Sequence, residues 1–321
     1  MRAIIQEKYG DPQGLKLKDI PKPTPKSDEV LVKIKATSVN DYDWSLVRGK
    51  PYIYRLMFGL NSPKSPTPGM EFAGIVEQVG SDASNFKVGD RVYGDSSDDK
   101  FGTYAEYFCA QKNSLVKMPE NLSFENAAAT PHACLLAVQA LKDIAKIREH
   151  QKILINGAGG GVGHFALHYS KLFDAHVTGV DASHKHAPMK EAGFDATLDY
   201  TTTDFTKVRQ EFDIILDTKS QKYPWQYLSV LTPKGTYVSV GGYLPNILYL
   251  ALLGPLLKKT TGKSISVLAL KPNSGLDELN SLINEEKLFC PIDGPYSLEE
   301  APKAIQRFGE ALHNGKVVIT I

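Results

Sequence analysis

Residues 153–163 read ILINGAGGGVG and decide the fold class of this chain. The apolar first part is typical of a buried strand, and a helix is expected from about Val162 onward. Ala158, Gly160 and Gly163 occupy the three marked positions of the pattern G-x-G-x-x-G. Glycines allow a sharp turn and a close approach of the backbone to a ligand, and free N–H groups at a helix start attract a diphosphate. Because the glycines follow a strand and open a helix, the stretch predicts a dinucleotide-binding turn.

Alternating strands and helices follow this turn. The expected strands are residues 152–156, 176–180, 212–216, 236–240 and 264–270, and the expected helices are residues 162–173, 187–192 and 225–231. Such alternation predicts βαβ units that form a parallel sheet with helices on both faces. The expected fold class is therefore α/β, with a doubly wound Rossmann sheet.

The part of the chain before residue 123 has a different pattern. Short expected strands at residues 30–37, 72–79 and 90–93, separated by Gly, Pro, Asp and Ser, predict a small β-barrel. Residues 50–68 show no clear period, so we interpret them as a long loop of a kind that is often functional. A helix is expected over residues 298–312 and a strand over residues 316–321. We place the change between the two patterns near residue 122.

Composition excludes several classes of function. The net charge is +1 and no basic run occurs, which argues against binding to nucleic acid. The three cysteines, Cys109, Cys134 and Cys290, lie far apart, which is typical of a reducing compartment rather than of a disulfide framework or a clustered metal site. The first residues do not resemble a secretory signal, so we expect a cytoplasmic protein. His164 and His168 are four apart, but no acid or cysteine accompanies them, and we expect no metal site.

One apolar segment needs a separate interpretation. Residues 244–257 are rich in leucine, but the segment is shorter than the ~20 residues that a spanning helix needs, and Pro245, Gly254 and Pro255 interrupt it. We expect a helix against a core or a subunit interface and no transmembrane segment. A helix that lies on a membrane surface is the alternative.

The candidate cofactor residues follow from the turn and from the strand ends. They are Gly157, Ala158, Gly160, Gly161, Val162 and Gly163 in the turn, Asp181, Ser183 and Lys185 after the second strand, and Gly241 and Gly242 after the strand at 236–240. A carboxylate such as Asp181 accepts hydrogen bonds from the adenosine ribose, which favours NAD(H). Ser183 and Lys185, with the histidines beside them, could instead bind the 2′-phosphate of NADP(H). Both cofactors therefore stay open.

Several short motifs together resemble one family. They are SVN at residues 38–40 with Asp43, PGMEFAG at 68–74, VGDRV at 88–92, GTYAE at 102–106, AAA at 127–129, the glycine turn, and GKVV at 315–318. This set is similar to the zinc-free quinone oxidoreductase-like branch, which includes zeta-crystallin, of the medium-chain dehydrogenase/reductase superfamily. The resemblance implies a GroES-like domain at residues 1–122, a Rossmann domain at 123–271, and a segment at 272–321 that returns to the first domain. It also implies NADPH as the usual hydride donor and a homodimer or tetramer.

Departures from the zinc-dependent relatives concern the metal. The resemblance implies that those relatives carry Cys where this chain has Asn40, and His where it has Met70. The loop at residues 94–102 lacks the four cysteines of their structural zinc site. Catalytic zinc needs three protein ligands of the Cys, His or carboxylate kind, so we expect catalysis without zinc. Glu71 stands where this branch usually has Asp, and Leu136 stands where it commonly has Thr.

The candidate catalytic residues follow from the expected chemistry. Hydride transfer to a quinone or an α,β-unsaturated carbonyl leaves negative charge on the carbonyl oxygen, which then needs a hydrogen-bond donor. The candidates are Asn40, Asp43 as an orienting group, Arg48, and the tyrosines Tyr52 and Tyr54 of the long loop.

Two other functions stay open. One is an enoyl-thioester reductase of the same fold, and the other is a non-catalytic NAD(P)H-binding redox sensor. No residue decides among the three, because fold alone does not fix function.

Overall fold

A computed structural model describes residues 1–321, which form two compact units. The first unit comprises residues 1–132, 272–285 and 292–321, and the second comprises residues 133–271 and 286–291. Residues 123–132, which the sequence places with the Rossmann domain, lie in the first unit. The reason is local packing, because helix α3 (Phe124–Ala128) lies against strands β3 (Glu29–Ser38) and β4 (Glu71–Val79).

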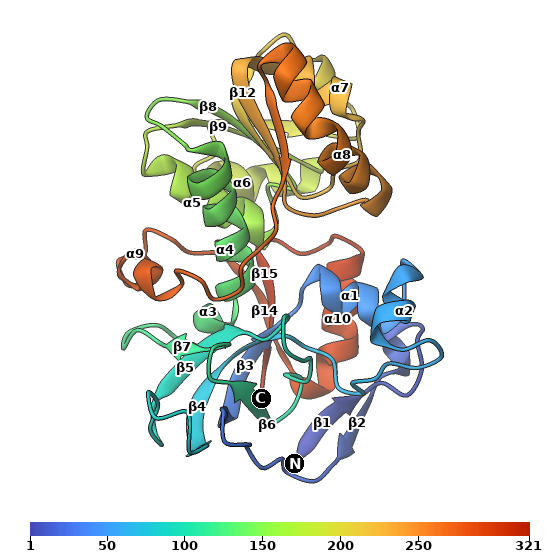
Figure 1. The fold of residues 1–321 in the computed structure, drawn as a ribbon, viewed down its shortest axis with the longest axis vertical. Helices are drawn as coiled ribbons and strands as arrows, with labels where there is room; N and C mark the ends of the chain where they lie inside the picture. The colour runs from blue at the N-terminus through green and yellow to red at the C-terminus, as the bar shows by residue number, and fades with distance from the viewer. The chain divides into compact units, whose positions relative to one another are not determined.

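The second unit is built on a six-stranded parallel sheet with the strand order β10-β9-β8-β11-β12-β13 (Figure 1). The strands are β8 (Lys152–Asn156), β9 (His176–Asp181), β10 (Ala196–Asp199), β11 (Phe212–Asp217), β12 (Leu231–Ser239) and β13 (Ser264–Val267). The buried residues of β8 and β11 form nearly continuous apolar runs, as parallel strands covered on both faces require. The strand order reverses direction at β8, which is the point where ligands bind in doubly wound sheets. The predicted Rossmann sheet is confirmed.

Helices connect these strands. They are α4 (Pro131–Val138), continued by a π-helix (Gln139–Ala145), and α5 (Gly161–Lys171), α6 (His186–Ala192), α7 (Pro224–Leu228) and α8 (Leu244–Thr261). The helix expected at residues 225–231 ends early, because Leu231 already belongs to strand β12 and pairs with Phe212. Strand β10 was not expected from the sequence, since its four residues are only partly buried.

The first unit contains a second sheet with the order β14-β15-β3-β4-β5-β7, and strand β6 also pairs with β3. The further strands are β5 (Arg91–Asp95), β6 (Tyr107–Gln111), β7 (Val116–Lys117), β14 (Ile292–Ser297) and β15 (Lys316–Thr320). A two-stranded sheet of β1 (Arg2–Ile5) and β2 (Lys16–Asp19) is separate from it. Val318 of β15 pairs antiparallel with Ser38 of β3, so the C-terminal segment supplies a strand beside the N-terminal ones.

The expected loop at residues 50–68 is partly helical. Helices α1 (Asp41–Arg48) and α2 (Ile53–Phe58) lie one after the other, and α9 (Asn280–Asn284) and α10 (Ala301–Gly309) belong to the same unit. The turn of α2 begins where the amide of Tyr54 donates to the carbonyl of Pro51. Its Tyr54 and Phe58 rings then meet at 6.2 Å, a pairing that stabilises residues four apart in a helix. The expectation of a loop without structure was wrong there.

Helix α8 contains the apolar segment noted in the sequence. An added Cβ at Gly254 would lie 2.4 Å from the carbonyl oxygen of Ile265, so this helix packs closely against strand β13. Leu248, Leu252 and Leu256 recur at every fourth residue and are exposed on the other side. Neither α8 nor any other helix of the structure combines the length and apolar character needed to cross a bilayer.

Candidate active site

The glycine turn has the geometry of an anion-binding loop. Strand β8 leads into Gly157, whose φ of +85° favours glycine, and Gly160 caps helix α5. An added Cβ at Gly163 would lie 2.2 Å from the carbonyl oxygen of Ala158, and one at Gly157 would lie 2.0 Å from Oγ1 of Thr218. Side chains are therefore excluded at both positions. Ala158, Gly161 and Val162 complete a turn that leaves the start of an eleven-residue helix available to a diphosphate.

Asp181 at the end of β9 is bound to this turn. Its Oδ2 accepts a hydrogen bond of 2.9 Å from the amide of Gly159, and its Oδ1 accepts one of 2.9 Å from the amide of Ala182. The ammonium nitrogen of Lys185 lies 3.7 Å from Oδ1, and its side chain is buried. Ser183 begins the short 3-10 turn that carries Lys185. Asp181, which favours NAD(H), and Lys185, which favours NADP(H), thus form one ion pair.

Gly241 and Gly242 follow strand β12 at the same edge of the sheet, because the ends of parallel strands lie together. Gly242 has a φ of +114°, and an added Cβ would lie 2.0 Å from the carbonyl oxygen of Lys219. Gly241 differs, since its nearest atom would be the carbonyl oxygen of Thr218 at 3.7 Å. Packing within the protein therefore requires glycine at position 242. At position 241 there is space for a side chain or for a ligand.

In the first unit, the carboxylate of Glu71 collects four hydrogen bonds. Its Oε2 accepts from the hydroxyl of Ser38 at 2.6 Å, from Nδ2 of Asn40 at 2.7 Å and from Nζ of Lys316 at 2.5 Å. Its Oε1 accepts from the amide of His132 at 2.6 Å. Glu71 is fully buried and Lys316 is 4% exposed. A buried carboxylate needs this degree of pairing, so these residues form one buried polar cluster around Glu71.

Asn40 has a single possible amide orientation in this cluster. Lys316 donates to its Oδ1 at 2.5 Å, and its Nδ2 donates to Glu71. An ammonium group has only donors and a carboxylate only acceptors, so exchanging the oxygen and nitrogen of Asn40 would break both bonds. Oδ1 is therefore committed to Lys316, and one proton of Nδ2 is left over.

Asp43 fixes the backbone around Asn40. Its Oδ2 accepts from the amide of Asn40 at 2.8 Å, and its Oδ1 accepts from the amide of Gly69 at 3.0 Å. Burial raises the pKa of Asp43 to about 7, and the Asn40 amide and the nearby Lys316 charge only partly oppose this rise. Asp43 thus holds the backbone of Asn40 in place at the start of helix α1.

His132 and Asp95 form a pair that sequence reasoning missed. Nδ1 of His132 lies 2.7 Å from Oδ2 of Asp95, which is fully buried. Burial alone would raise the pKa of Asp95, but the charge and hydrogen bond of His132 lower it. The two residues are 37 positions apart and belong to no motif, so no signal in the sequence could have joined them.

Aromatic side chains border this pair. Tyr42 of α1 meets His132 edge-on at a centroid distance of 6.4 Å, and its ring also neighbours Tyr54 and Phe101. Phe58 joins Tyr54 to Phe101. We call Tyr42, Tyr54, Phe58 and Phe101 the aromatic patch; its members are partly exposed. Burial, with Tyr42 and Asp41 nearby, raises the pKa of Tyr54 to about 12, so its hydroxyl stays protonated at neutral pH.

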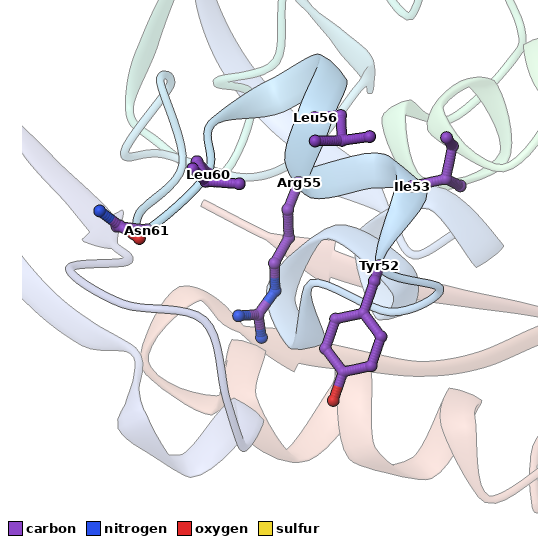
Figure 2. Close-up of a pocket in the computed structure, with 6 residues that line it drawn as sticks. All are labelled: Tyr52, Ile53, Arg55, Leu56, Leu60 and Asn61. Atoms are coloured by element: carbon purple, nitrogen blue, oxygen red, sulfur yellow. The ribbon is translucent and has the colours of Figure 1, made fainter.

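The other candidates of the first unit lie elsewhere. Tyr52 is 66% exposed and lines a surface hollow of about 500 Å³ together with Ile53, Arg55, Leu56, Leu60 and Asn61. Figure 2 shows that Tyr52 and Arg55 extend side by side from the start of α2, and the guanidinium lies 5.1 Å from the ring. Arg48 stacks on Trp44. The contacts of Tyr52 and Arg48 are thus with Arg55 and Trp44 rather than with the buried polar cluster.

The residues around Glu71 do not fit a zinc site of the kind that the resemblance implies for zinc-dependent relatives. Asn40 and Met70 replace two ligands, and the ammonium of Lys316 bonds to both Asn40 and Glu71. No group of three or more His, Cys, Asp or Glu side chains in the structure is arranged to hold a metal ion.

Two family models match the chain. The alcohol dehydrogenase GroES-like domain matches residues 26–120, and the zinc-binding dehydrogenase model matches residues 192–319. The first match confirms the predicted GroES-like domain. The second model is named for zinc binding, but the side chains around Glu71 do not supply the ligands of a zinc ion.

Relatives match the chain from end to end. A chloroplastic quinone-oxidoreductase homolog of Spinacia oleracea is 33% identical over 99% of this chain and 98% of its own length. A chloroplast envelope quinone oxidoreductase homolog of Arabidopsis thaliana is 31% identical with the same coverage. Among solved structures, the quinone oxidoreductase from Coxiella burnetii is 27% identical with a TM-score of 0.85, covering 100% of this chain and 99% of the other. The chain is an oxidoreductase and belongs to the quinone oxidoreductase-like branch of the medium-chain dehydrogenase/reductase superfamily.

Proposed function

We propose that this protein is a zinc-independent reductase that transfers a hydride from NAD(P)H to a quinone or an α,β-unsaturated carbonyl. The observation that carries the proposal is the single amide orientation of Asn40 between Lys316 and Glu71. A buried, fixed N–H donor is what a carbonyl oxygen needs as it gains negative charge. The names of the relatives from spinach and Arabidopsis agree with this chemistry.

The cofactor would be held by the second unit. The turn at Gly157, Gly160 and Gly163 would bind the diphosphate, and Asp181 with Lys185 would meet the adenosine ribose. The bound nicotinamide supplies the hydride. Gly241 offers a backbone position at the same sheet edge where no side chain blocks a ligand.

Asn40 would act on the acceptor by hydrogen bonding. One Nδ2 proton goes to Glu71, and the second is available to the acceptor oxygen. The Lys316 ammonium withdraws electron density through Oδ1 and so strengthens that donor. Asp43 holds the backbone of Asn40 in place, and the aromatic patch offers flat apolar surface for a conjugated ring.

The test is a turnover assay with purified protein. We expect loss of cofactor absorbance at 340 nm when a small quinone is added to NADPH or to NADH, with loss of at least about 100-fold in kcat for Asn40→Ala. No oxidation of either cofactor by any quinone or enone would refute the proposal. Tight NADPH binding without turnover would instead favour the redox sensor.

NADP(H) is the cofactor that we propose, with NAD(H) as the alternative. The Escherichia coli quinone oxidoreductase whose structure contains NADPH shares the fold at a TM-score of 0.81. In this chain, Lys185 is the cation that could pair with a 2′-phosphate, and Asp181 is the carboxylate that would repel it. Titration of the protein with NADPH and NADH, followed by fluorescence, decides between them.

An enoyl-thioester reductase is the second candidate. The solved CurK enoyl reductase is 25% identical to this chain with a TM-score of 0.84. A 2-methylene-furan-3-one reductase of Solanum lycopersicum, a relative named for a small enone, is 30% identical. Turnover of a free enone beside the matching thioester separates the two functions.

A cytoplasmic homodimer or tetramer is also proposed. Strand β13 lies at the edge of its sheet, and helix α8, which packs on it, exposes Leu248, Leu252 and Leu256 on its other side. Unpaired edges and apolar faces are commonly covered by a second copy. Light scattering after gel filtration measures the subunit number.

A further inference from the structure

His132 stands where the buried polar cluster meets the aromatic patch. Its backbone amide donates to Oε1 of Glu71, and the ring of Tyr42 meets its imidazole edge-on. The side chain is 13% exposed, whereas Asp95 behind it is fully buried. The Nδ1 edge of the imidazole is therefore tied to the protein interior, while the side chain is not completely covered.

Asp95 determines which nitrogen of the imidazole carries a proton. Its carboxylate has only acceptors, so Nδ1 of His132 donates to it. Asp95 is itself held, because Ser97 donates its amide to Oδ1 at 2.8 Å and Asn273 pairs with its backbone at 2.8 and 2.7 Å. Nε2 of His132 makes no hydrogen bond within the protein. Such a carboxylate–imidazole pair presents Nε2 for proton exchange.

We propose that His132 is a catalytic acid that protonates the reduced acceptor and that Asp95 is its positioning residue. The inference rests on the reductase function proposed above. Asn40 and His132 bind the two different oxygens of Glu71. The same carboxylate therefore positions Asn40, the proposed hydrogen-bond donor, and His132, the proposed proton donor. The aromatic patch beside His132 would hold the conjugated ring.

The proton balance of the step is complete. The acceptor gains a hydride, which is two electrons and one proton, in one new bond, and NAD(P)H is left as NAD(P)⁺. The acceptor oxygen becomes anionic. The N–H bond at Nε2 of the imidazolium breaks, and an O–H bond forms on the acceptor. The imidazole remains neutral, with its remaining proton on Nδ1 hydrogen-bonded to Asp95, and solvent returns the Nε2 proton. The sum is one NAD(P)H and one proton consumed for each hydroquinone released.

Other charged groups surround the imidazole and enter any pH dependence. Asp95 of β5 bonds to the imidazole itself, and Tyr42 of α1 meets its ring. Glu71 of β4, paired with Lys316 of β15, bonds to the backbone amide of His132, and Asp41 and Asp98 lie near Tyr42. A general acid acts in its protonated form, so the proposed role of His132 predicts a rate that falls toward high pH.

Two matched variants test the proposal. In His132→Asn, the amide nitrogen replaces Nδ1 and keeps a donor for Asp95, but nothing replaces Nε2. In His132→Gln, the amide reaches the place of Nε2 and the bond to Asp95 is lost. We expect His132→Asn to lower kcat with quinone by about 10²- to 10⁴-fold, with unchanged melting temperature and unchanged NADPH affinity, and to abolish the falling limb of the pH–rate profile. Added imidazole should restore part of the His132→Ala activity.

A binding measurement keeps the test independent of turnover. 4-Nitrophenolate carries an anionic oxygen on a conjugated ring, and its absorbance reports its protonation. We expect wild-type protein to bind it at least about 10-fold more tightly than His132→Asn. Normal kcat in His132→Asn would overturn the role of His132 and leave the reductase function intact. If wild-type protein turns over no acceptor, the function fails, and equal nitrophenolate binding by both proteins would overturn the His132 role as well.

Discussion

Asn40 and His132 are held by opposite oxygens of one buried carboxylate, that of Glu71. One residue contributes its side-chain amide to that carboxylate, and the other contributes its backbone amide. Their spacing is thus set by the size of a carboxylate group rather than by a flexible loop. A movement of Glu71 displaces both residues together.

Replacing Asn40 by Ala should reduce catalysis more than folding. Loss of one donor to a developing oxyanion costs about 10²- to 10³-fold in kcat. The affinity for NADPH should not change, because the residues proposed to bind the cofactor lie in the second unit. Ser38→Ala is the matched control, since Ser38 also donates to Glu71 but has no other role in the proposal. Equal kcat losses in both variants would show that only the integrity of the cluster matters.

Replacing Lys316 by Met should destabilise the first unit strongly. The variant leaves the Glu71 charge without its cation, and breaking a buried ion pair costs about 3–5 kcal/mol. The double variant Lys316→Met with Glu71→Gln should recover part of this loss, because no unpaired charge stays buried. Urea unfolding followed by circular dichroism measures both changes, and a double variant less stable than the single one would contradict the assignment.

Substitutions at Gly163 and Gly241 distinguish a glycine required by packing within the protein from one required by contact with the cofactor. Gly163→Ala should abolish dinucleotide binding, since the new methyl group would lie 2.2 Å from the carbonyl oxygen of Ala158. Gly241→Ala should leave stability unchanged, because the nearest atom would be 3.7 Å away. If Gly241 lies against the nicotinamide, this variant should nevertheless weaken cofactor binding by about 10-fold or more. Unchanged affinity would remove Gly241 from the site.

Asp181 gives a prediction about cofactor choice. Asp181→Ser removes the carboxylate that would repel a 2′-phosphate and keeps the ammonium of Lys185, which lies 3.7 Å from that carboxylate in the wild-type protein. The ratio of NADPH to NADH affinity should rise by about 10-fold or more, as expected when a charge repulsion becomes an attraction. Lys185→Ala is the complementary change and should lower the same ratio. A ratio that moves in neither variant would exclude this ion pair from the adenosine site.

Asp43 predicts how stability depends on pH. Burial raises its folded-state pKa to about 7 from an ordinary value of 3.8, so the folded protein holds the proton more tightly than the unfolded chain. Its contribution is therefore complete below about pH 4 and is lost as the pH rises through 7. Between pH 5 and pH 8 the wild-type protein should lose about 2–3 kcal/mol relative to Asp43→Asn. Parallel curves for the two proteins in urea titrations would argue against a protonated Asp43.

The sequence predicts the second unit better than the first. Its strands are continuous apolar runs and its turn carries glycines, so local pattern and sheet position agree. The short helix α2 escapes prediction because ring contacts with Tyr42 and Phe101 help to hold it. The pair of His132 and Asp95 and the bonds of Lys316 depend on residues that only the fold brings together. Motifs identify Asn40 as a candidate, but nothing in them shows which atoms hold its amide.

The separation of Glu71 and Lys316 by 245 positions affects how the chain is made. A ribosome adds roughly 5–20 residues per second, so Lys316 is synthesised on the order of 10–50 s after Glu71. All of the Rossmann sheet is synthesised during that interval. The ion pair of Glu71 and Lys316 can therefore form only after every strand of the second unit has been synthesised.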